Sequence, residues 1–128
     1  GISVNELTAI GRDEWPAITQ IVFRNYQWGA EKRNSTLWFK DNFVGTELDT
    51  GVSYAGIAKA CGLKGVEART MDELTAVLNQ AIVDQMENNI TTVIEVILNQ
   101  ELGEPFRRDA MKQPVEVAGI KASDMAAE

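Results

Sequence analysis

Two stretches of the chain are almost continuously apolar, which is typical of strands buried in a parallel sheet. They cover residues 17–23 and 91–98, and the second is rich in β-branched residues. A shorter run, residues 65–69, fits a third strand. Because segments with helical spacing separate these runs, the pattern predicts an α/β fold with a mostly parallel sheet that is covered by helices on both faces.

Two short helices are predicted from apolar spacing and capping residues. Residues 4–11 carry apolar side chains at helical spacing, and Ser3 precedes them as a candidate N-cap. Residues 54–60 follow Ser53, a second candidate N-cap, and Gly62 is expected to stop that helix. The first helix and the strand at 17–23 then form the back half of a βαβ unit.

The longest helix is expected to open at the capping box Thr70-Met71-Asp72-Glu73 and to end near residues 88–89. Its apolar residues recur at intervals of three and four, as one buried stripe requires. The stripe consists of Leu74, Val77, Leu78, Ala81, Ile82 and Met86.

Residues 30–52 show the least regular pattern and are interpreted as a long loop, a kind of segment that is usually functional in a compact domain. Its aromatic side chains pack the loop onto its own core or a subunit partner, or else cover a cofactor or substrate. Glu95 interrupts the last apolar run, so we expect it at a sheet edge or paired with a cation; a catalytic role is the minor alternative.

Composition limits the classes of function. The 128 residues are 45% hydrophobic and 24% charged, as in an ordinary globular domain. A net charge of −7 argues against general nucleic-acid and anionic-membrane surfaces, which need clustered cations. Cys61 is the single cysteine, so no internal disulfide is possible, and a cytoplasmic location is expected. With no histidine, the commonest general base is missing, so the chemistry must come from a cofactor or another chain.

The strand at 17–23 breaks abruptly into polar residues, and this break predicts a ligand site. Ligands of open α/β sheets lie outside the carboxyl ends of the strands, where Asn25 stands. Its amide oxygen is a suitable ligand for Mg²⁺, and the backbone carbonyl of Gln27 can supply a second oxygen. Gly29 permits close approach of the backbone, and a helix beginning near it would offer free N–H groups to a phosphate.

These residues also resemble a known motif. Residues 1–29 resemble the second half of the metal and diphosphate motif of thiamine-diphosphate-dependent enzymes, in which an Asn follows a Gly-Asp-Gly turn by about one helix and one strand. Residues 1–7 are similar to the segment directly after that turn, so the chain is expected to begin just beyond it. Residues 23–34, 42–48 and 98–110 together are most similar to the sulfoacetaldehyde acetyltransferases, and the similarity covers essentially the whole chain.

The resemblance implies a three-layer αβα thiamine-diphosphate-binding fold, truncated at its N-terminus. Residues 1–128 would then be one partial domain, the C-terminal part of a larger, homo-oligomeric enzyme. The implied cofactors are thiamine diphosphate and Mg²⁺. The metal would be bound by the Asn25 side chain and the Gln27 carbonyl, and the diphosphate by the backbone of Gln27, Trp28, Gly29 and Ala30.

The implied reaction converts sulfoacetaldehyde and phosphate to acetyl phosphate and sulfite. No catalytic residue is predicted in this chain, and the chain alone is expected to be inactive, because the aspartate of the turn and the activating glutamate lie elsewhere in such enzymes. Arg107 and Arg108 follow the last strand and can bind a substrate phosphate or sulfonate, or pair with nearby carboxylates instead.

Two alternatives stay open. One keeps the cofactor and changes the substrate, as in acetolactate synthase. The other is a non-catalytic α/β interaction module, which the missing turn and the lack of histidine favour. On any of these interpretations, a missing first strand would leave an apolar sheet edge uncovered, so self-association of the chain is expected.

Overall fold

The described part of the chain, residues 4–101 of a computed structural model, falls into two compact units. Of the described residues, the first unit comprises 4–25 and 51–99, and the second comprises 26–50 and 100–101. The candidate N-cap Ser3 lies outside the described residues.

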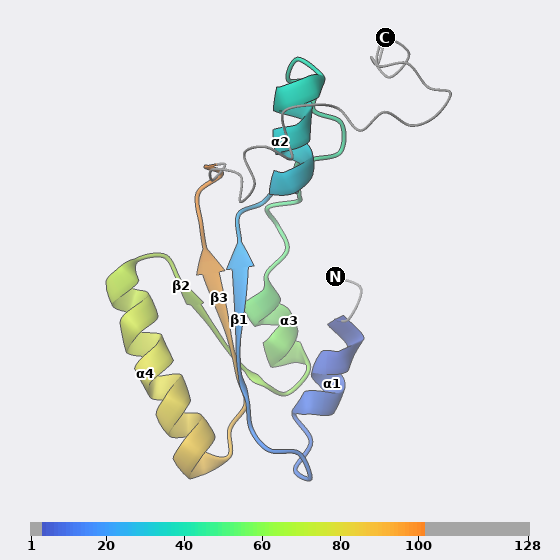
Figure 1. Ribbon diagram of the computed structural model, residues 1–128. Coiled ribbons are helices and arrows are strands. Elements are labelled where there is room, and N and C mark those ends of the chain that lie inside the picture. The colour runs from blue at the N-terminus through green and yellow to red at the C-terminus, as the bar shows by residue number, and fades with distance from the viewer. Residues whose placement is uncertain (1–3, 102–128) are drawn as a thin grey trace. The chain divides into compact units, whose positions relative to one another are not determined.

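Three parallel strands form the sheet of the first unit (Figure 1). They are β1 (Thr19–Arg24), β2 (Lys64–Ala68) and β3 (Thr92–Ile97), in the spatial order β1-β3-β2. Strand β3 lies in the centre and is buried along almost its whole length, which explains its nearly continuous apolar sequence. The predicted parallel sheet is therefore confirmed, with strand ends shifted by one or two residues.

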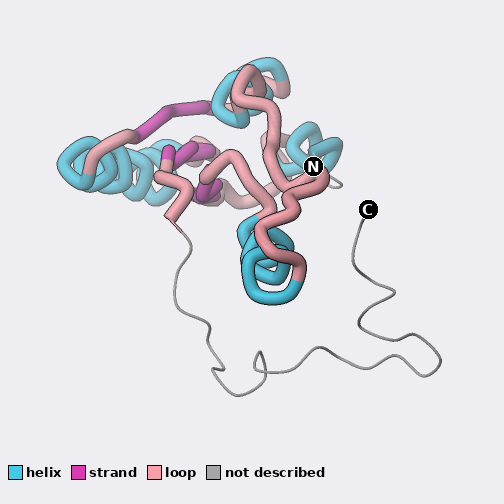
Figure 2. Tube along the Cα trace, turned by 90° about the horizontal axis from the view of Figure 1, so that it is seen from above, coloured by secondary structure: helices cyan, strands magenta, loops and turns pink. Residues whose placement is uncertain are grey.

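Helices cover both faces of this sheet and give it three layers (Figure 1, Figure 2). On one face, α1 (Leu7–Ile10), which continues a 3₁₀ turn at Val4–Glu6, and α3 (Tyr54–Ala60) enclose a core around Val93. On the other face, α4 (Met71–Asn88) packs on Ile94 and Val96. The two clusters use alternate residues of β3, as the two-residue period of a strand requires.

The predicted caps of α3 and α4 are confirmed. The Ser53 hydroxyl accepts a hydrogen bond from the Gly56 N–H at 3.0 Å, and the Thr70 hydroxyl accepts one from the Glu73 N–H at 3.2 Å. After α3, Gly62 has a φ of +83°, a conformation that favours glycine at a helix end. Cys61 is half-buried and packs against the core cluster around Val93, as a small apolar residue can.

The predicted stripe of α4 is wrong in its last two turns. Ala81 is buried, but Ile82 is 48% exposed and Met86 is 76% exposed. Here the helix turns polar side chains towards the starts of the strands: Asp84 pairs with Lys64, and Gln85 accepts a hydrogen bond from the Thr19 hydroxyl. At this end of α4, polar side chains therefore face the sheet, and Ile82 and Met86 do not.

The interpretation of residues 30–52 as one long loop is also wrong. Residues Gly29–Trp38 form α2 in the second unit, and only the segment after it lacks regular structure apart from one β-bridge at Glu47. The helix buries none of its residues fully, so its sequence lacks the apolar stripe by which amphipathic helices are recognised. Helix α2 begins at Gly29, in agreement with the helix start near Gly29 that was considered in interpreting the sequence.

Strand β1 forms one side of the described sheet and exposes apolar side chains. Ile21 is 39% exposed and Phe23 is 67% exposed. Exposed apolar side chains on an edge strand favour pairing with another chain or segment, so the expected self-association stays a prediction with this surface as its basis.

Candidate functional site

Asn25 directly follows β1, at the carboxyl end of the parallel strands. The ladder continues to this point, because the Leu98 N–H donates to the Arg24 carbonyl at 2.9 Å. Asn25 therefore lies at the edge of the sheet where α/β folds bind ligands. Its role as a metal ligand stays a prediction.

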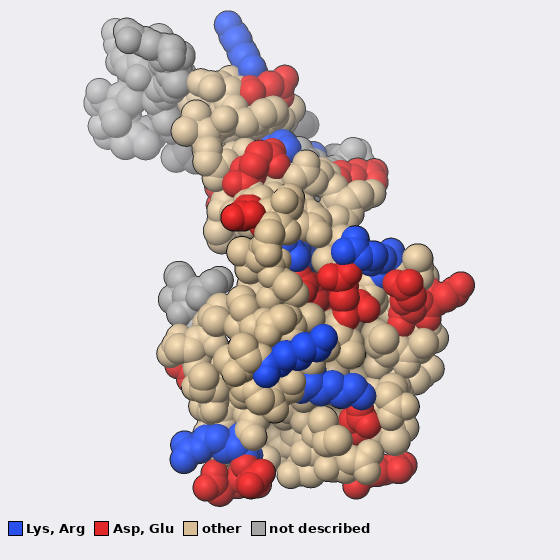
Figure 3. Space-filling model, turned by 180° about the vertical axis from the view of Figure 1, so that it is seen from behind, with Lys and Arg blue, Asp and Glu red and all other residues tan. Residues whose placement is uncertain are grey.

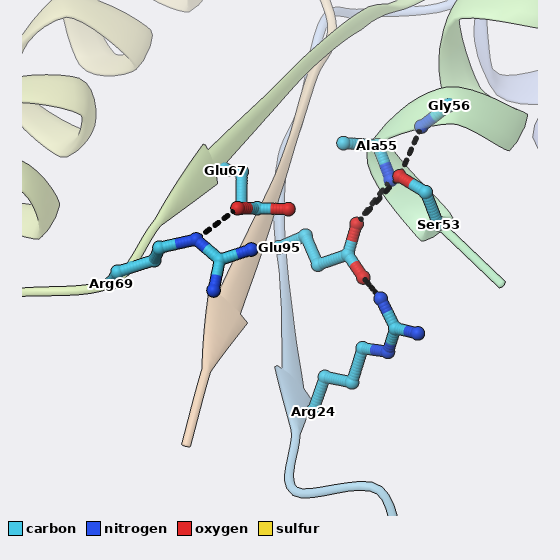
Figure 4. Close-up of polar contacts among 7 residues, drawn as sticks. All are labelled: Arg24, Ser53, Ala55, Gly56, Glu67, Arg69 and Glu95. Carbon is cyan, nitrogen blue, oxygen red and sulfur yellow. Dashed lines mark hydrogen bonds and ion pairs between the residues drawn. The ribbon is translucent and has the colours of Figure 1, made fainter. Parts of the chain in front are cut away.

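A buried carboxylate connects the carboxyl end of β1 to α3 (Figure 4). Glu95 is fully buried on the central strand and paired with Arg24, so the expectation that it lies at an edge or is paired with a cation is confirmed by the pairing. Its Oε1 accepts from Arg24 Nη1 at 2.6 Å, and its Oε2 accepts from the Ser53 hydroxyl at 3.0 Å and the Ala55 N–H at 2.9 Å. Both oxygens are thus occupied by protein donors, which favours a structural role.

These donors decide the ionisation of Glu95. Burial acts to raise the pKa of the carboxyl, but hydrogen bonds from the Ala55 N–H, Arg24, Ser53 and the Tyr54 N–H together outweigh it and lower the pKa below its ordinary value of 4.5. Glu95 is therefore ionised at neutral pH and balances the charge of Arg24, which is 8% exposed.

The second unit begins with a strained turn. Tyr26 has a φ of 59°, the left-handed region that bulky residues rarely adopt. The turn leads into an antiparallel bridge between Gln27 and Glu47. Two backbone hydrogen bonds flank the bridge, from the Leu48 N–H to the Tyr26 carbonyl at 2.8 Å and from the Trp28 N–H to the Thr46 carbonyl at 2.7 Å. The segment with the predicted cofactor-binding residues is therefore anchored to residues 46–48.

Side chains reinforce this anchor. Glu47 forms an ion pair with Lys32, in the first part of α2, and accepts a hydrogen bond from Gln100 Nε2 at 2.8 Å. Hydrogen bonds from Lys32 and then Gln100 lower the pKa of Glu47, so this carboxylate is ionised at neutral pH. Lys32 Nζ also lies 5.2 Å from the centre of the Phe43 ring.

The start of α2 has the features of an anion site. Within the described part of the chain, no side chain caps α2 at Trp28, so the first N–H groups of the helix have no side-chain acceptor there. The neighbouring Thr46 is 4% exposed, and its buried hydroxyl has no hydrogen-bond partner among the described residues. Helix N-termini and hydroxyl groups both donate to phosphate oxygens. The residues present therefore fit a diphosphate group.

The described residues also bear on metal binding, membrane insertion and surface charge. Between residues 4 and 101, no group of three or more His, Cys, Asp and Glu side chains could hold a metal ion. No helix in that range is long and apolar enough to cross a membrane. Acidic and basic side chains are interspersed on the face drawn in Figure 3. The predicted anion-binding residues Arg107 and Arg108 lie outside the described residues.

Comparison with known proteins identifies the family of the chain. Residues 1–96 match the family model described as "Thiamine pyrophosphate enzyme, C-terminal TPP binding domain". The chain belongs to the thiamine pyrophosphate enzymes. Thiamine pyrophosphate is the cofactor that is also called thiamine diphosphate, so the family expected from the motif is confirmed.

Three relatives of this thiamine pyrophosphate enzyme domain share one name. The chain is 78% identical over 125 residues to a sulfoacetaldehyde acetyltransferase of Roseovarius nubinhibens and 73% identical to one of Rhodobacter capsulatus. A sulfoacetaldehyde acetyltransferase of Castellaniella defragrans is 44% identical over 115 residues. The first two matches cover 98% of this chain and 21% of the relative, so the chain spans about a fifth of the length of these proteins.

Sequence reasoning did not identify Thr46, Glu47 and Gln100 as parts of the site. Thr46 and Glu47 fall in one of the blocks that carry the family resemblance, and this was the available signal. Gln100 falls in another of these blocks, but it is 73 positions from Gln27, with which it forms a hydrogen bond, and no local pattern reports a contact over that separation.

Proposed function

We propose that the chain is the C-terminal cofactor-binding part of a thiamine-diphosphate-dependent sulfoacetaldehyde acetyltransferase. The observation that carries the proposal is the 78% identity, over nearly the whole chain, to a protein of that name. On this proposal, the complete enzyme converts sulfoacetaldehyde and phosphate to acetyl phosphate and sulfite. It is a cytoplasmic homo-oligomer, and other parts of the enzyme supply the remaining catalytic groups.

Within this enzyme, the described residues would hold the diphosphate end of the cofactor. The Asn25 amide oxygen and the Gln27 carbonyl would bind Mg²⁺, since this hard cation prefers oxygen ligands. The backbone of Gln27, Trp28, Gly29 and Ala30 would bind the diphosphate, and the uncapped start of α2 supports that assignment. The Thr46 hydroxyl, which has no partner within residues 4–101, is a further donor for the same group.

When bound, thiamine diphosphate supplies a thiazolium that stabilises a carbanion next to the reacting carbonyl. The residues of this chain contribute binding and orientation. The Glu95 network holds Arg24 at the end of β1, and the bridge between Gln27 and Glu47 holds the turn before α2. None of these side chains is proposed to transfer a proton to or from the substrate.

The proposed activity predicts sulfite release. The complete enzyme that carries this chain, incubated with sulfoacetaldehyde, phosphate, Mg²⁺ and thiamine diphosphate, should produce sulfite and acetyl phosphate in equal amounts. Omission of phosphate or of thiamine diphosphate should abolish the product. Acetolactate formed from pyruvate, with no sulfite from sulfoacetaldehyde, would instead support the acetolactate synthase alternative.

The metal assignment predicts a specific effect of Asn25→Ala. In the complete enzyme, this change should weaken Mn²⁺ binding, measured by electron paramagnetic resonance as a substitute for Mg²⁺, by roughly tenfold or more, because it removes an oxygen ligand. The melting temperature without metal should stay near that of the unchanged enzyme, because Asn25 is not in the core. Equal Mn²⁺ affinity in the two proteins would rule out Asn25 as a ligand.

A further inference from the structure

Gln100 forms hydrogen bonds with both residues of the strained turn, Tyr26 and Gln27, and with Glu47. Its Nε2 donates to the Tyr26 carbonyl at 3.4 Å and to Glu47 Oε2 at 2.8 Å. Its own main-chain carbonyl accepts a hydrogen bond from Gln27 Nε2 at 2.9 Å. One residue that follows β3 thus contacts both residues of the turn and the segment that pairs with them.

The turn depends on such contacts. A tyrosine with a φ of 59° persists only where surrounding contacts determine the backbone, because the conformation is unfavourable for a bulky side chain. The Tyr26 carbonyl accepts hydrogen bonds from the Leu48 N–H and from Gln100. Loss of the bond from Gln100 would therefore remove one of the contacts that orient the following peptide.

Glu47 connects Gln100 to α2. One oxygen of its carboxylate accepts from Gln100, and the other pairs with Lys32. The start of α2 and the turn that carries the Gln27 carbonyl are therefore tied to one carboxylate. This linkage joins the proposed metal-binding peptide to the proposed diphosphate-binding helix end.

Gln100 and Glu47 are exposed, so their contacts can orient the turn while contributing little to the free energy of folding. Exposed polar pairs contribute little to the free energy of folding, because water replaces each partner at small cost. Their contacts nevertheless restrict a turn whose carbonyl must point at a metal. A change at Gln100 should therefore affect ligand binding more than folding.

From these contacts we infer that Gln100 is a positioning residue for the Mg²⁺–diphosphate site. It does not touch the ligands. It holds the Tyr26–Gln27 turn, and through Glu47 the first part of α2, in the conformation that binds them. The inference rests on the proposed function, since it names a residue that supports the same site.

The test uses the complete enzyme with Gln100→Ala and Gln100→Met. Methionine has nearly the length of glutamine but cannot donate to Tyr26 or Glu47, so both variants should behave alike. The dissociation constant for Mn²⁺, measured by electron paramagnetic resonance, should rise about 10- to 100-fold, the range seen when a group that orients a metal ligand is removed. Calorimetry should show weaker binding of thiamine diphosphate, with little change in melting temperature without ligands.

Gln80→Ala is the matched control. Gln80 is also an exposed glutamine whose Nε2 donates to a carboxylate, that of Asp84 at 3.0 Å, but it lies on α4. This variant should bind Mn²⁺ and thiamine diphosphate as the unchanged enzyme does.

The outcomes separate this inference from the proposed function. If Asn25→Ala weakens Mn²⁺ binding while both Gln100 variants stay within twofold of the unchanged enzyme, the positioning role is wrong and the metal site stands. The positioning role is equally wrong if the Gln100 variants only lower the melting temperature. If Asn25→Ala leaves Mn²⁺ binding unchanged, the metal site is wrong and the inference fails with it.

Discussion

Glu95→Ala should lower the free energy of unfolding by about 3–5 kcal/mol, the cost of removing one partner from a buried ion pair. The change leaves Arg24, 8% exposed, without the carboxylate that balances its charge. It also removes the acceptor for Ser53 and Ala55 at the start of α3. Urea unfolding followed by circular dichroism measures the loss.

The neighbouring pair in Figure 4 provides the control. Glu67 accepts from Arg69 Nε at 2.6 Å, but both side chains are substantially exposed, so Glu67→Ala should cost less than about 1 kcal/mol. Replacing both buried partners, as in Arg24→Met with Glu95→Met, should recover much of the stability, because no buried charge is left unpaired. Equal effects of Glu67→Ala and Glu95→Ala would contradict the buried pair.

Gly65→Ala should destabilise the first unit by about 3 kcal/mol or more, at the upper end of the usual cost of overpacking. Gly65 is buried in β2, and a Cβ atom there would lie 2.0 Å from the Ala55 carbonyl oxygen and 2.8 Å from its carbon. These are backbone atoms of α3, so no side-chain rotation can relieve the overlap. The helix must move away from the sheet, and the same unfolding experiment should detect it.

Gly62→Ala separates this steric effect from the conformational cost of alanine. A Cβ at Gly62 would have no atom of the described residues within 4 Å, but the φ of Gly62 is +83°. The variant should therefore lose only about 1–2 kcal/mol, the cost of the left-handed conformation. If Gly65→Ala were milder than Gly62→Ala, the close approach of α3 to β2 would be wrong.

The sequence was most informative where local rules and packing agree. The capping residues Ser53 and Thr70 located the starts of α3 and α4, because a cap depends on residues only a few positions away. The apolar run at 91–98 identified β3, because a central parallel strand is buried on both faces. Helix α2 lacked a buried stripe, and periodicity alone did not reveal it.

The sequence by itself determined the family, the parallel α/β architecture and the position of Asn25 after a strand, since each depends on motif, period or neighbouring residues. Only the tertiary structure decided that Glu95 pairs with Arg24 and that Gln100 donates to the Tyr26 carbonyl, because these partners are 71 and 74 positions apart. Contacts over such separations arise when the sheet and its loops assemble, and no periodic pattern along the chain encodes them.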